Sequence, residues 1–299
     1  MLRLTRRTGL RILALFATLL AGASSPGLAD TGKSGPQGPE IRIQRWLIPM
    51  PKAQGRVLAA TVARPPGDAP ATLVVINHGS PPRASVRAYM VEPLYRFATE
   101  WFVRRGHVVV LPLRRGYGVT GGNGPEFLHR CRDADYVHSG RAAAQDIDAT
   151  IDFMQRQPFV RPGSVIVVGI SAGGWSTIGH TSLNRKDVRV AINFAGGRGG
   201  SANRENRTVC QPDRLVSAAR EFGRTARVPT LWIYAENDSF FKPALAKAMH
   251  SAYVSAGGNA ELHQLGPFGR DGHSLFGARD GPRIWGPIVS RFLARHGFK

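Results

Sequence analysis

The feature that most constrains this chain is the stretch 164–174, which reads S-V-I-V-V-G-I-S-A-G-G. Its first half is apolar and β-branched, as in a strand that is buried on both faces. Its second half contains the only G-x-S-x-G of the chain, at 169–173, and Trp175 and Ile178 follow at helical spacing. A strand, a sharp turn and a helix form the context of a nucleophile elbow, and this context predicts that Ser171 is a nucleophile.

The glycines of the motif agree with this interpretation. An elbow holds its nucleophile in a strained backbone conformation, so nearby positions must lack side chains, and Gly169 and Gly173 satisfy that requirement. The turn also places the N–H of Ala172 at the start of a helix, where it can donate to a developing oxyanion. The alternative is an ordinary glycine-rich turn, because the chain has 35 glycines. The catalytic interpretation therefore depends on the other parts that such a site needs.

A candidate acid and a candidate base follow Ser171 in the expected order. A serine hydroxyl attacks only when a base takes its proton, and a third group must orient that base. In this architecture the order along the chain is serine, acid, histidine. Asp238 follows the apolar run 230–235 and His273 follows the run 261–265, so we predict Asp238 as the acid and His273 as the base.

Each of these two residues has an alternative role. Asp238 could instead cap a helix that begins near Pro243, and Glu236 is a second candidate for the acid. His273 is one of nine histidines, and a histidine in a loop is commonly a surface or structural residue. The joint occurrence of the two candidates, in order and each after its own strand, favours the catalytic roles.

The second oxyanion donor is expected in the loop after the third strand. His78-Gly79-Ser80-Pro81 stands at that place, directly after the apolar run 71–77. We predict that Ser80 supplies the N–H and that His78 and Gly79 form the turn. The alternative is a simple Gly-Ser-Pro turn without a role in catalysis.

The rest of the chain alternates between short apolar runs and amphipathic segments. Strands are expected at 41–48, 57–62, 71–77, 107–111, 164–168, 188–194, 230–235 and 261–265, and helices after the elbow and at 94–102, 143–154, 212–222, 245–254 and 284–293. This alternation predicts an α/β fold, with a mostly parallel eight-stranded sheet, helices on both faces and a ligand site at the carboxyl ends of the strands. Asp146 and Asp148, in the helix expected at 143–154, are expected at the surface.

From about residue 41 to its end, the chain resembles the α/β-hydrolase superfamily, nearest to dienelactone-hydrolase-like and prolyl-oligopeptidase-like serine esterases. The resemblance is carried by H-G-S-P at 78–81, R-R-G-Y-G at 114–118, G-I-S-A-G at 169–173, Asp238 and D-G-H at 271–273. It implies an α/β-hydrolase fold and a catalytic triad of Ser171, Asp238 and His273. Dienelactone hydrolases proper carry a cysteine where Ser171 stands, so the resemblance does not extend to lactone specificity.

Two long segments, at about 119–140 and 196–227, leave the same edge of the predicted sheet, so we expect them to form a small lid over the site. Cys131 lies in the first segment and Cys210 in the second, and an even cysteine count in an exported chain favours a disulfide between them. The second segment also carries Arg198, Arg204, Arg207, Arg214, Arg220 and Arg224. These arginines could attract an anionic acyl group, or they could form a solvated face.

The N-terminus reads as a targeting segment. Arginines at 3, 6, 7 and 11 precede an apolar run at 12–23, which is too short for a comfortable membrane span, and small residues follow it. We therefore predict a signal peptide at 1–29, a linker at 30–40 and one hydrolase domain at 41–299. A periplasmic or secreted protein without a transmembrane span after cleavage is the expected product; an uncleaved anchor is the alternative.

Composition narrows the function classes. The formal net charge is +20, but the 34 arginines and 6 lysines form no run of five or more like charges, and no nucleic-acid-binding motif accompanies them. No metal-ligand spacing surrounds the two cysteines. We therefore expect a serine hydrolase that cleaves a small-molecule carboxylic ester through an acyl-enzyme, without a cofactor, metal or nucleic acid. The alternatives are a serine peptidase of the same fold and a non-catalytic ligand-binding homologue, and the oligomeric state is left open.

Overall fold

The computed structural model describes residues 41–53, 55–128, 130–200 and 209–298. The predicted signal peptide and linker, at 1–40, lie outside the described residues. Among the described residues, no helix has the length and apolar character needed to cross a bilayer.

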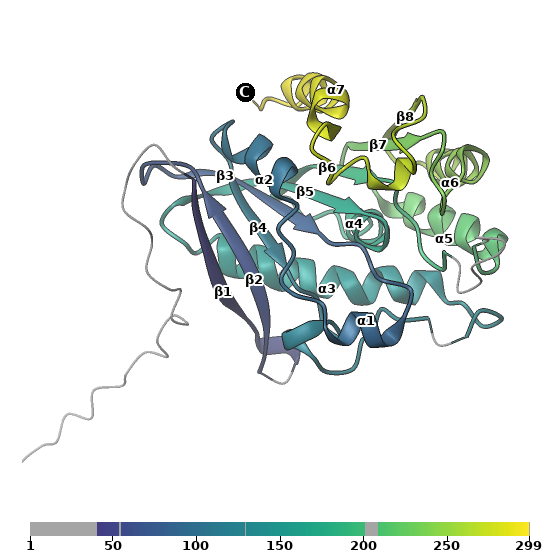
Figure 1. Cartoon of the computed structure of the whole chain (residues 1–299), viewed down its shortest axis with the longest axis horizontal. Helices are drawn as coiled ribbons and strands as arrows, with labels where there is room; N and C mark the ends of the chain where they lie inside the picture. Colours follow the sequence, from purple (N-terminus) through teal and green to yellow (C-terminus); the bar gives the residue numbers. More distant parts are fainter. Residues whose placement is uncertain (1–40, 54, 129, 201–208, 299) are drawn as a thin grey trace, which may run out of the picture.

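One eight-stranded sheet forms the centre of the molecule (Figure 1). Its order is β1-β2-β4-β3-β5-β6-β7-β8. β2 pairs antiparallel with both of its neighbours, β1 and β4, and the remaining neighbouring strands are parallel. The strands are β1 (Arg42–Met50), β2 (Arg56–Arg64), β3 (Ala71–Asn77), β4 (Val108–Pro112), β5 (Val160–Ile170), β6 (Val188–Phe194), β7 (Thr230–Ala235) and β8 (Ala260–Leu265). The predicted sheet is confirmed, because every apolar run that was expected to form a strand does so.

Helices cover both faces of this sheet. They are α1 (Ala84–Ala88), α2 (Arg96–Val103), α3 (Tyr136–Met154), α4 (Ala172–Thr181), α5 (Pro212–Thr225), α6 (Pro243–Ser255) and α7 (Gly281–Arg295), with short 3₁₀ helices η1 (Pro51–Ala53), η2 (Gly118–Thr120) and η3 (Gly272–Ser274). The central strands are apolar on both faces of the sheet. Because successive residues of a strand point to opposite faces, each strand contributes to two hydrophobic cores, one on each side of the sheet. One core joins Val74 and Ile166 to Trp101 of α2 and Trp285 of α7, and the other joins the opposite face of the strands to α3.

One expectation about α3 is wrong. The side chain of Asp146 is not at the surface, because the residue is only 1% exposed. Its carboxylate accepts hydrogen bonds from the backbone N–H and the guanidinium of Arg115, at 2.8 and 2.6 Å. Asp148 is half-buried and pairs with His180 and Arg185. Apolar periodicity therefore marked the buried stripe of α3 but not the buried ion pair beside it.

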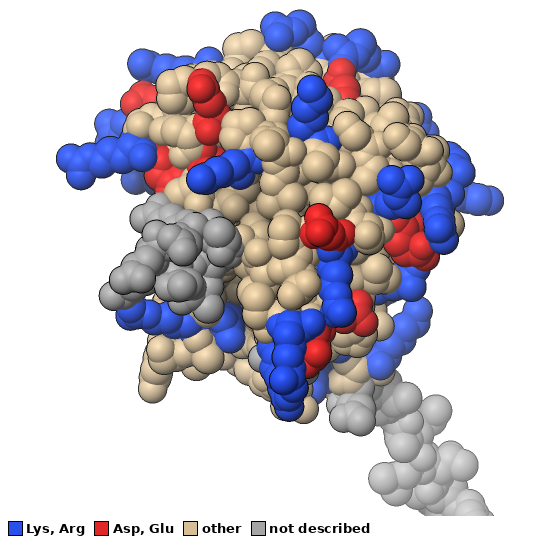
Figure 2. Space-filling view, turned by 90° about the vertical axis from the view of Figure 1, so that its right-hand side faces the viewer, with Lys and Arg blue, Asp and Glu red and all other residues tan. Residues whose placement is uncertain are grey.

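The fold brings the motifs of the sequence to one edge. Parallel strands β3, β5, β7 and β8 all end there, so the loops after them lie next to one another. These loops contain His78–Pro81, Ser171, Asp238 and His273. In the face shown in Figure 2, lysines and arginines are spread around the periphery with acidic residues among them, and they do not form a single stripe.

Candidate active site

Ser171 lies in a strained turn between β5 and α4. Its backbone angles are φ 57° and ψ −122°, in the left-handed region that is costly for a residue with a side chain. The turn needs glycine on both sides. A Cβ on Gly169 would stand 2.1 Å from the carbonyl oxygen of Gly173, and a Cβ on Gly173 would stand 2.0 Å from that of Asn77. The backbone therefore has the form of the predicted elbow.

The structure brings together His273 and Asp238, the residues that the order of motifs predicted as base and acid. His273 Nδ1 lies 3.0 Å from Asp238 Oδ2, and Asp238 is buried. The other oxygen, Oδ1, accepts the backbone N–H groups of Phe240 and Phe241 at 2.8 and 2.9 Å. These bonds hold the carboxylate in place, so the Nδ1–H of the imidazole donates to Asp238 and its Nε2 is left as a base.

The alternatives for the acid do not fit this geometry. The cap position of α6 is Lys242, and no side chain caps that helix, so Asp238 is not its cap. Glu236 is exposed. A second carboxylate, Asp271, accepts the N–H and hydroxyl of Ser239 and the N–H of His273 at 3.0, 2.6 and 3.0 Å. It ties the loop of the acid to the loop of the base.

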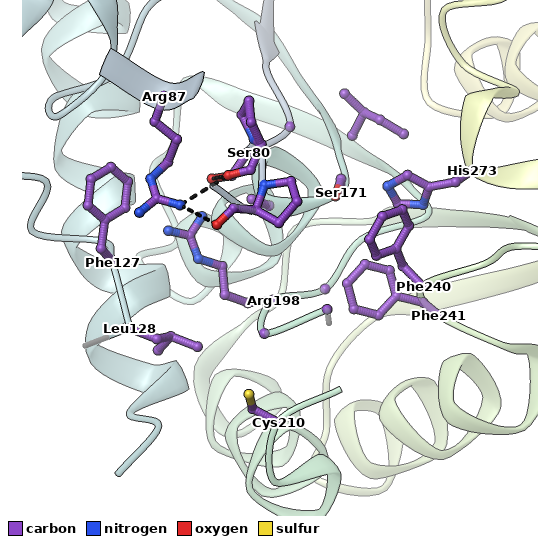
Figure 3. A pocket seen from close by; sticks show the side chains of 18 of the residues that line it. Ser80, Arg87, Phe127, Leu128, Ser171, Arg198, Cys210, Phe240, Phe241 and His273 are labelled. Carbon is purple, nitrogen blue, oxygen red and sulfur yellow. Dashed lines mark hydrogen bonds between the residues drawn. The ribbon is translucent and has the colours of Figure 1, made fainter. Parts of the chain in front are cut away.

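Ser171 and His273 line the same pocket, which has a volume of about 550 Å³ (Figure 3). Within the described residues their side chains are not hydrogen-bonded to each other, and such bonds commonly tighten only when substrate is bound. The rings of Phe240 and Phe241 lie 4.5 and 5.9 Å from the imidazole. Both rings also line the pocket, so the imidazole lies beside an apolar part of the pocket wall.

The turn at 78–81 lies against the elbow. A Cβ on Gly79 would stand 3.3 Å from the Cβ of Ser171, and Ser80 and Ala172 both line the pocket beside the hydroxyl. The Gly79 N–H is already bonded to the hydroxyl of Tyr95, at 3.1 Å. Ser80 is therefore the next residue along this turn whose N–H can serve an oxyanion. Ala172 is the first residue of α4, where backbone N–H groups have no partner within the helix.

Two rings hold this turn, the buried imidazole of His78 and the partly buried ring of Tyr95. His78 Nε2 accepts the N–H of Arg114 at 3.1 Å and its Nδ1 lies 2.7 Å from the Gly79 carbonyl oxygen. Burial, together with the charge of Arg114, lowers the pKa of His78 to about 3, so the ring stays neutral and keeps one fixed donor and one fixed acceptor. Tyr95 is held at φ 41°. No local pattern singled out Tyr95, because its partner is sixteen positions away in the chain.

A buried charge cluster that no local sequence pattern indicates adjoins the pocket through Arg198, which is one of the lining residues. Glu126 accepts the guanidinium groups of Arg114 and Arg198 at 2.6 and 2.8 Å and the hydroxyl of Tyr117. Burial by itself would raise the pKa of Glu126, but the two arginines outweigh it and hold that pKa well below its ordinary value. Two cations share one carboxylate, so the cluster has a net positive charge.

We predict that Glu126→Gln lowers the free energy of unfolding by about 3–5 kcal/mol at pH 7, because it leaves Arg114 and Arg198 buried without a counter-charge. The lowered pKa sets the pH dependence. The stabilisation that the Glu126 carboxylate provides is complete above pH 4.5, the ordinary pKa of a glutamate, and is lost progressively as the pH falls below that value. Urea unfolding of both proteins should therefore show a smaller difference at about pH 3.

Glu221→Gln is the matched control, since Glu221 forms exposed pairs with Arg141 and Arg224. This control substitution should lower the free energy of unfolding by less than about 1 kcal/mol. Equal costs for the two substitutions would contradict the role assigned to the buried carboxylate.

The disulfide predicted between Cys131 and Cys210 is present. It joins positions 79 residues apart, and in the chain-entropy model a loop of that length corresponds to a stabilisation of up to about 4–5 kcal/mol. Both cysteines line the pocket, and the Cys210 N–H donates to the Gly199 carbonyl at 2.9 Å. The crosslink therefore holds one wall of the pocket together.

The two predicted lid segments contribute to the pocket in part. Phe127, Leu128 and Cys131 of the first segment and Gly197–Gly200 and Cys210 of the second line the pocket. Their other described residues include the first turn of α3 and the whole of α5, whose buried face includes Leu215 and Phe222. Residues 201–208, with Arg204 and Arg207, lie outside the described residues.

Comparisons with known proteins agree with this architecture. The model of the dienelactone hydrolase family matches residues 91–281. The acetyl xylan esterase of Paenibacillus sp. R4 superposes with a TM-score of 0.62 at 14% identity, over 90% of this chain and 88% of the esterase. An esterase of Pyrococcus furiosus superposes with a TM-score of 0.60 at 16% identity, over 89% of this chain and 97% of the other.

A peptidase shares the fold as well. The acylaminoacyl peptidase of Pyrococcus horikoshii superposes with a TM-score of 0.60 at 14% identity, over 87% of this chain but only 42% of the peptidase. No curated protein sequence matches the chain. At these identities the superpositions establish the common fold, and they confirm the predicted α/β-hydrolase architecture.

Proposed function

Because this chain belongs to the dienelactone hydrolase family and has the hydrolase fold of that family, we propose that it is a serine hydrolase that cleaves carboxylic esters through an acyl-enzyme. The observation that carries the proposal is the hydrogen bond between His273 and Asp238 at the pocket that Ser171 also lines. A buried carboxylate, an oriented imidazole and an elbow serine are the three parts of nucleophilic acyl transfer.

In the proposed mechanism, Ser171 Oγ attacks the ester carbonyl while His273 Nε2 takes the hydroxyl proton. Asp238 keeps the imidazole in the required tautomer and stabilises its positive charge. The N–H groups of Ser80 and Ala172 donate to the carbonyl oxygen as it becomes negative. His273 then protonates the leaving alcohol. Water releases the acid from Ser171 by the same steps, with His273 again as the base.

Labelling with a fluorophosphonate tests this proposal. We expect one label per chain, on the peptide that contains Ser171, and loss of labelling after heating. A ligand-binding homologue without catalysis would remain unlabelled, and labelling at another serine would also contradict the proposal. Hydrolysis of aryl esters with no hydrolysis of aminoacyl anilides is expected for an esterase, and the reverse result would identify a peptidase.

We further propose that the ester carries a negative charge on its acyl group. Arg87, Arg130 and Arg198 line the pocket, and no aspartate or glutamate is among its described lining residues. Figure 3 shows Arg87 and Arg198 on the side of Ser171 opposite His273. Arg198 is only 7% exposed, so water screens its charge little. A carboxylate on the acyl group, a few bonds from the ester carbonyl, would pair with the Arg198 guanidinium.

Two esters of similar size, one with a charged acyl group and one without, test this preference. We expect a higher kcat/KM for the mono-4-nitrophenyl ester of succinic acid than for 4-nitrophenyl butyrate, which lacks the terminal carboxylate. Arg198→Met should reduce this ratio about tenfold or more, as expected for a charge-assisted hydrogen bond. Arg214→Met, at an exposed arginine of α5, should leave the ratio as it is. A ratio that Arg198→Met does not change would exclude Arg198 as the anion site.

Export to the periplasm or the medium is part of the proposal. A disulfide persists in oxidising compartments and is rare in the cytosol, so the Cys131–Cys210 bond supports the signal peptide that the sequence predicts at 1–29.

A further inference from the structure

Four exposed apolar side chains lie on two touching segments, one of which forms part of the pocket wall. Val86, Tyr89, Val91 and Val119 are 49%, 87%, 75% and 67% exposed, and we call them the rim patch. Val86 is in α1, Tyr89 and Val91 follow that helix, and Val119 is in η2. The two segments touch, because a Cβ on Gly118 would stand 1.8 Å from the Met90 carbonyl oxygen. Single exposed apolar residues are ordinary, whereas a shared patch marks an interaction surface.

The rim patch is continuous with the active-site pocket. Arg87 and Met90 line the pocket, whereas their neighbours Val86, Tyr89 and Val91 are exposed on the outside of the same segment. A surface that covered the rim patch would therefore lie beside the pocket mouth.

Unpaired positive charges surround the patch. Lys52, Arg56 and Arg83 are exposed, and none of them forms an ion pair within the described residues. Arg56 reaches the turn that follows η2, since a Cβ on Gly122 would stand 2.4 Å from its Nη1. Lys52 lies in η1, in the turn between β1 and β2 that Arg56 closes. Glu92, the nearby acid, is paired with Arg45.

We propose that the rim patch docks this protein on an anionic lipid surface. A tyrosine and three valines can enter the boundary between headgroups and acyl chains, while the three cations face anionic headgroups. The same charges disfavour a second copy of this chain as the occupant, because they would meet their own equivalents across a symmetric contact.

Co-sedimentation of the full protein with vesicles tests the proposal. Vesicles of phosphatidylcholine alone are compared with vesicles of equal parts phosphatidylcholine and phosphatidylglycerol. We expect binding to the anionic vesicles that weakens as salt rises. The triple variant Tyr89→Ser/Val91→Ser/Val119→Ser should bind the anionic vesicles at least about tenfold more weakly than the wild type. Each of Lys52→Gln, Arg56→Gln and Arg83→Gln should reduce binding about fivefold.

The matched control is Leu183→Ser/Val254→Ser/Ile284→Ser, at apolar residues that are 45%, 40% and 42% exposed and lie outside the rim patch. All variants are prepared with the same N-terminus as the wild type, so any contribution of that segment to vesicle binding is the same in each. Differences in binding between variants then report the substituted side chains. Wild-type binding by the rim variant, equal loss in the control, or equal binding to both vesicles would overturn the proposal. A rim variant that instead dissociates a dimer would identify a second copy as the occupant. All variants should keep fluorophosphonate labelling, which separates this test from that of the proposed function.

Discussion

Ser171→Ala is expected to lower kcat for ester hydrolysis about a million-fold, with the fold unchanged. Removing the nucleophile of a triad abolishes acyl-enzyme formation, and only the residual effect of binding and oxyanion donors remains. The substitution is small and the strained backbone is held by its neighbours. The Ser171 N–H donates to Phe194 and its carbonyl accepts from Trp175 and Gly197, at 3.0, 3.0 and 3.1 Å. The measurement is kcat on an aryl ester, with thermal unfolding as the check on folding.

Ser80→Ala is the matched control for this loss. Ser80 is proposed to act through its backbone N–H, which alanine retains, so the variant should keep kcat within about threefold of wild type. A Ser171→Ala enzyme that kept one hundredth of the wild-type kcat would place the nucleophile elsewhere.

Asp238→Asn is expected to lower kcat about ten-thousand-fold, the effect of forcing the wrong imidazole tautomer in a triad. The geometry explains why. The N–H groups of Phe240 and Phe241 both donate to Oδ1, so they would select the amide oxygen of asparagine at that position. The amide NH₂ would then face His273 Nδ1, at the place where Oδ2 now lies 3.0 Å away. Nδ1 would have to accept, and Nε2 would carry the proton and could not take one from Ser171.

Glu236→Gln separates the two candidate acids. It makes the same change of carboxylate to amide at an exposed residue two positions earlier, and we expect a kcat close to that of wild type. Steady-state kinetics of both variants on one ester decides the question. A large loss in Glu236→Gln with a small one in Asp238→Asn would reverse the assignment.

The elbow was predictable because its requirements are local. Gly169 and Gly173 are needed where a Cβ would collide with backbone within the same turn or the adjacent strand. The alternation of apolar runs predicted the strands for a similar reason, since a strand buried on both faces has to be apolar throughout. The disulfide followed from an even cysteine count in two segments that leave the same edge of the sheet.

The residues around the pocket were less predictable. Asp146 was expected at the surface because a charged residue is seldom buried without a partner, and that partner, Arg115, lies on a loop after another strand. Glu126 and Arg198 are 72 positions apart. Nothing near Arg198 in the chain distinguishes it from the exposed arginines of α5, yet among the described arginines of this segment it is the one that lines the pocket.

By itself, the sequence determined the elements, their order and the backbone of the elbow, because glycine requirements and apolar periodicity act over a few residues. Only the tertiary structure decided that Asp238 and not Glu236 meets the imidazole, and that Arg198, among the described arginines of the second lid segment, lines the pocket. Those outcomes depend on which loops meet at the edge of the sheet, and the packing that brings them together is spread over the whole chain.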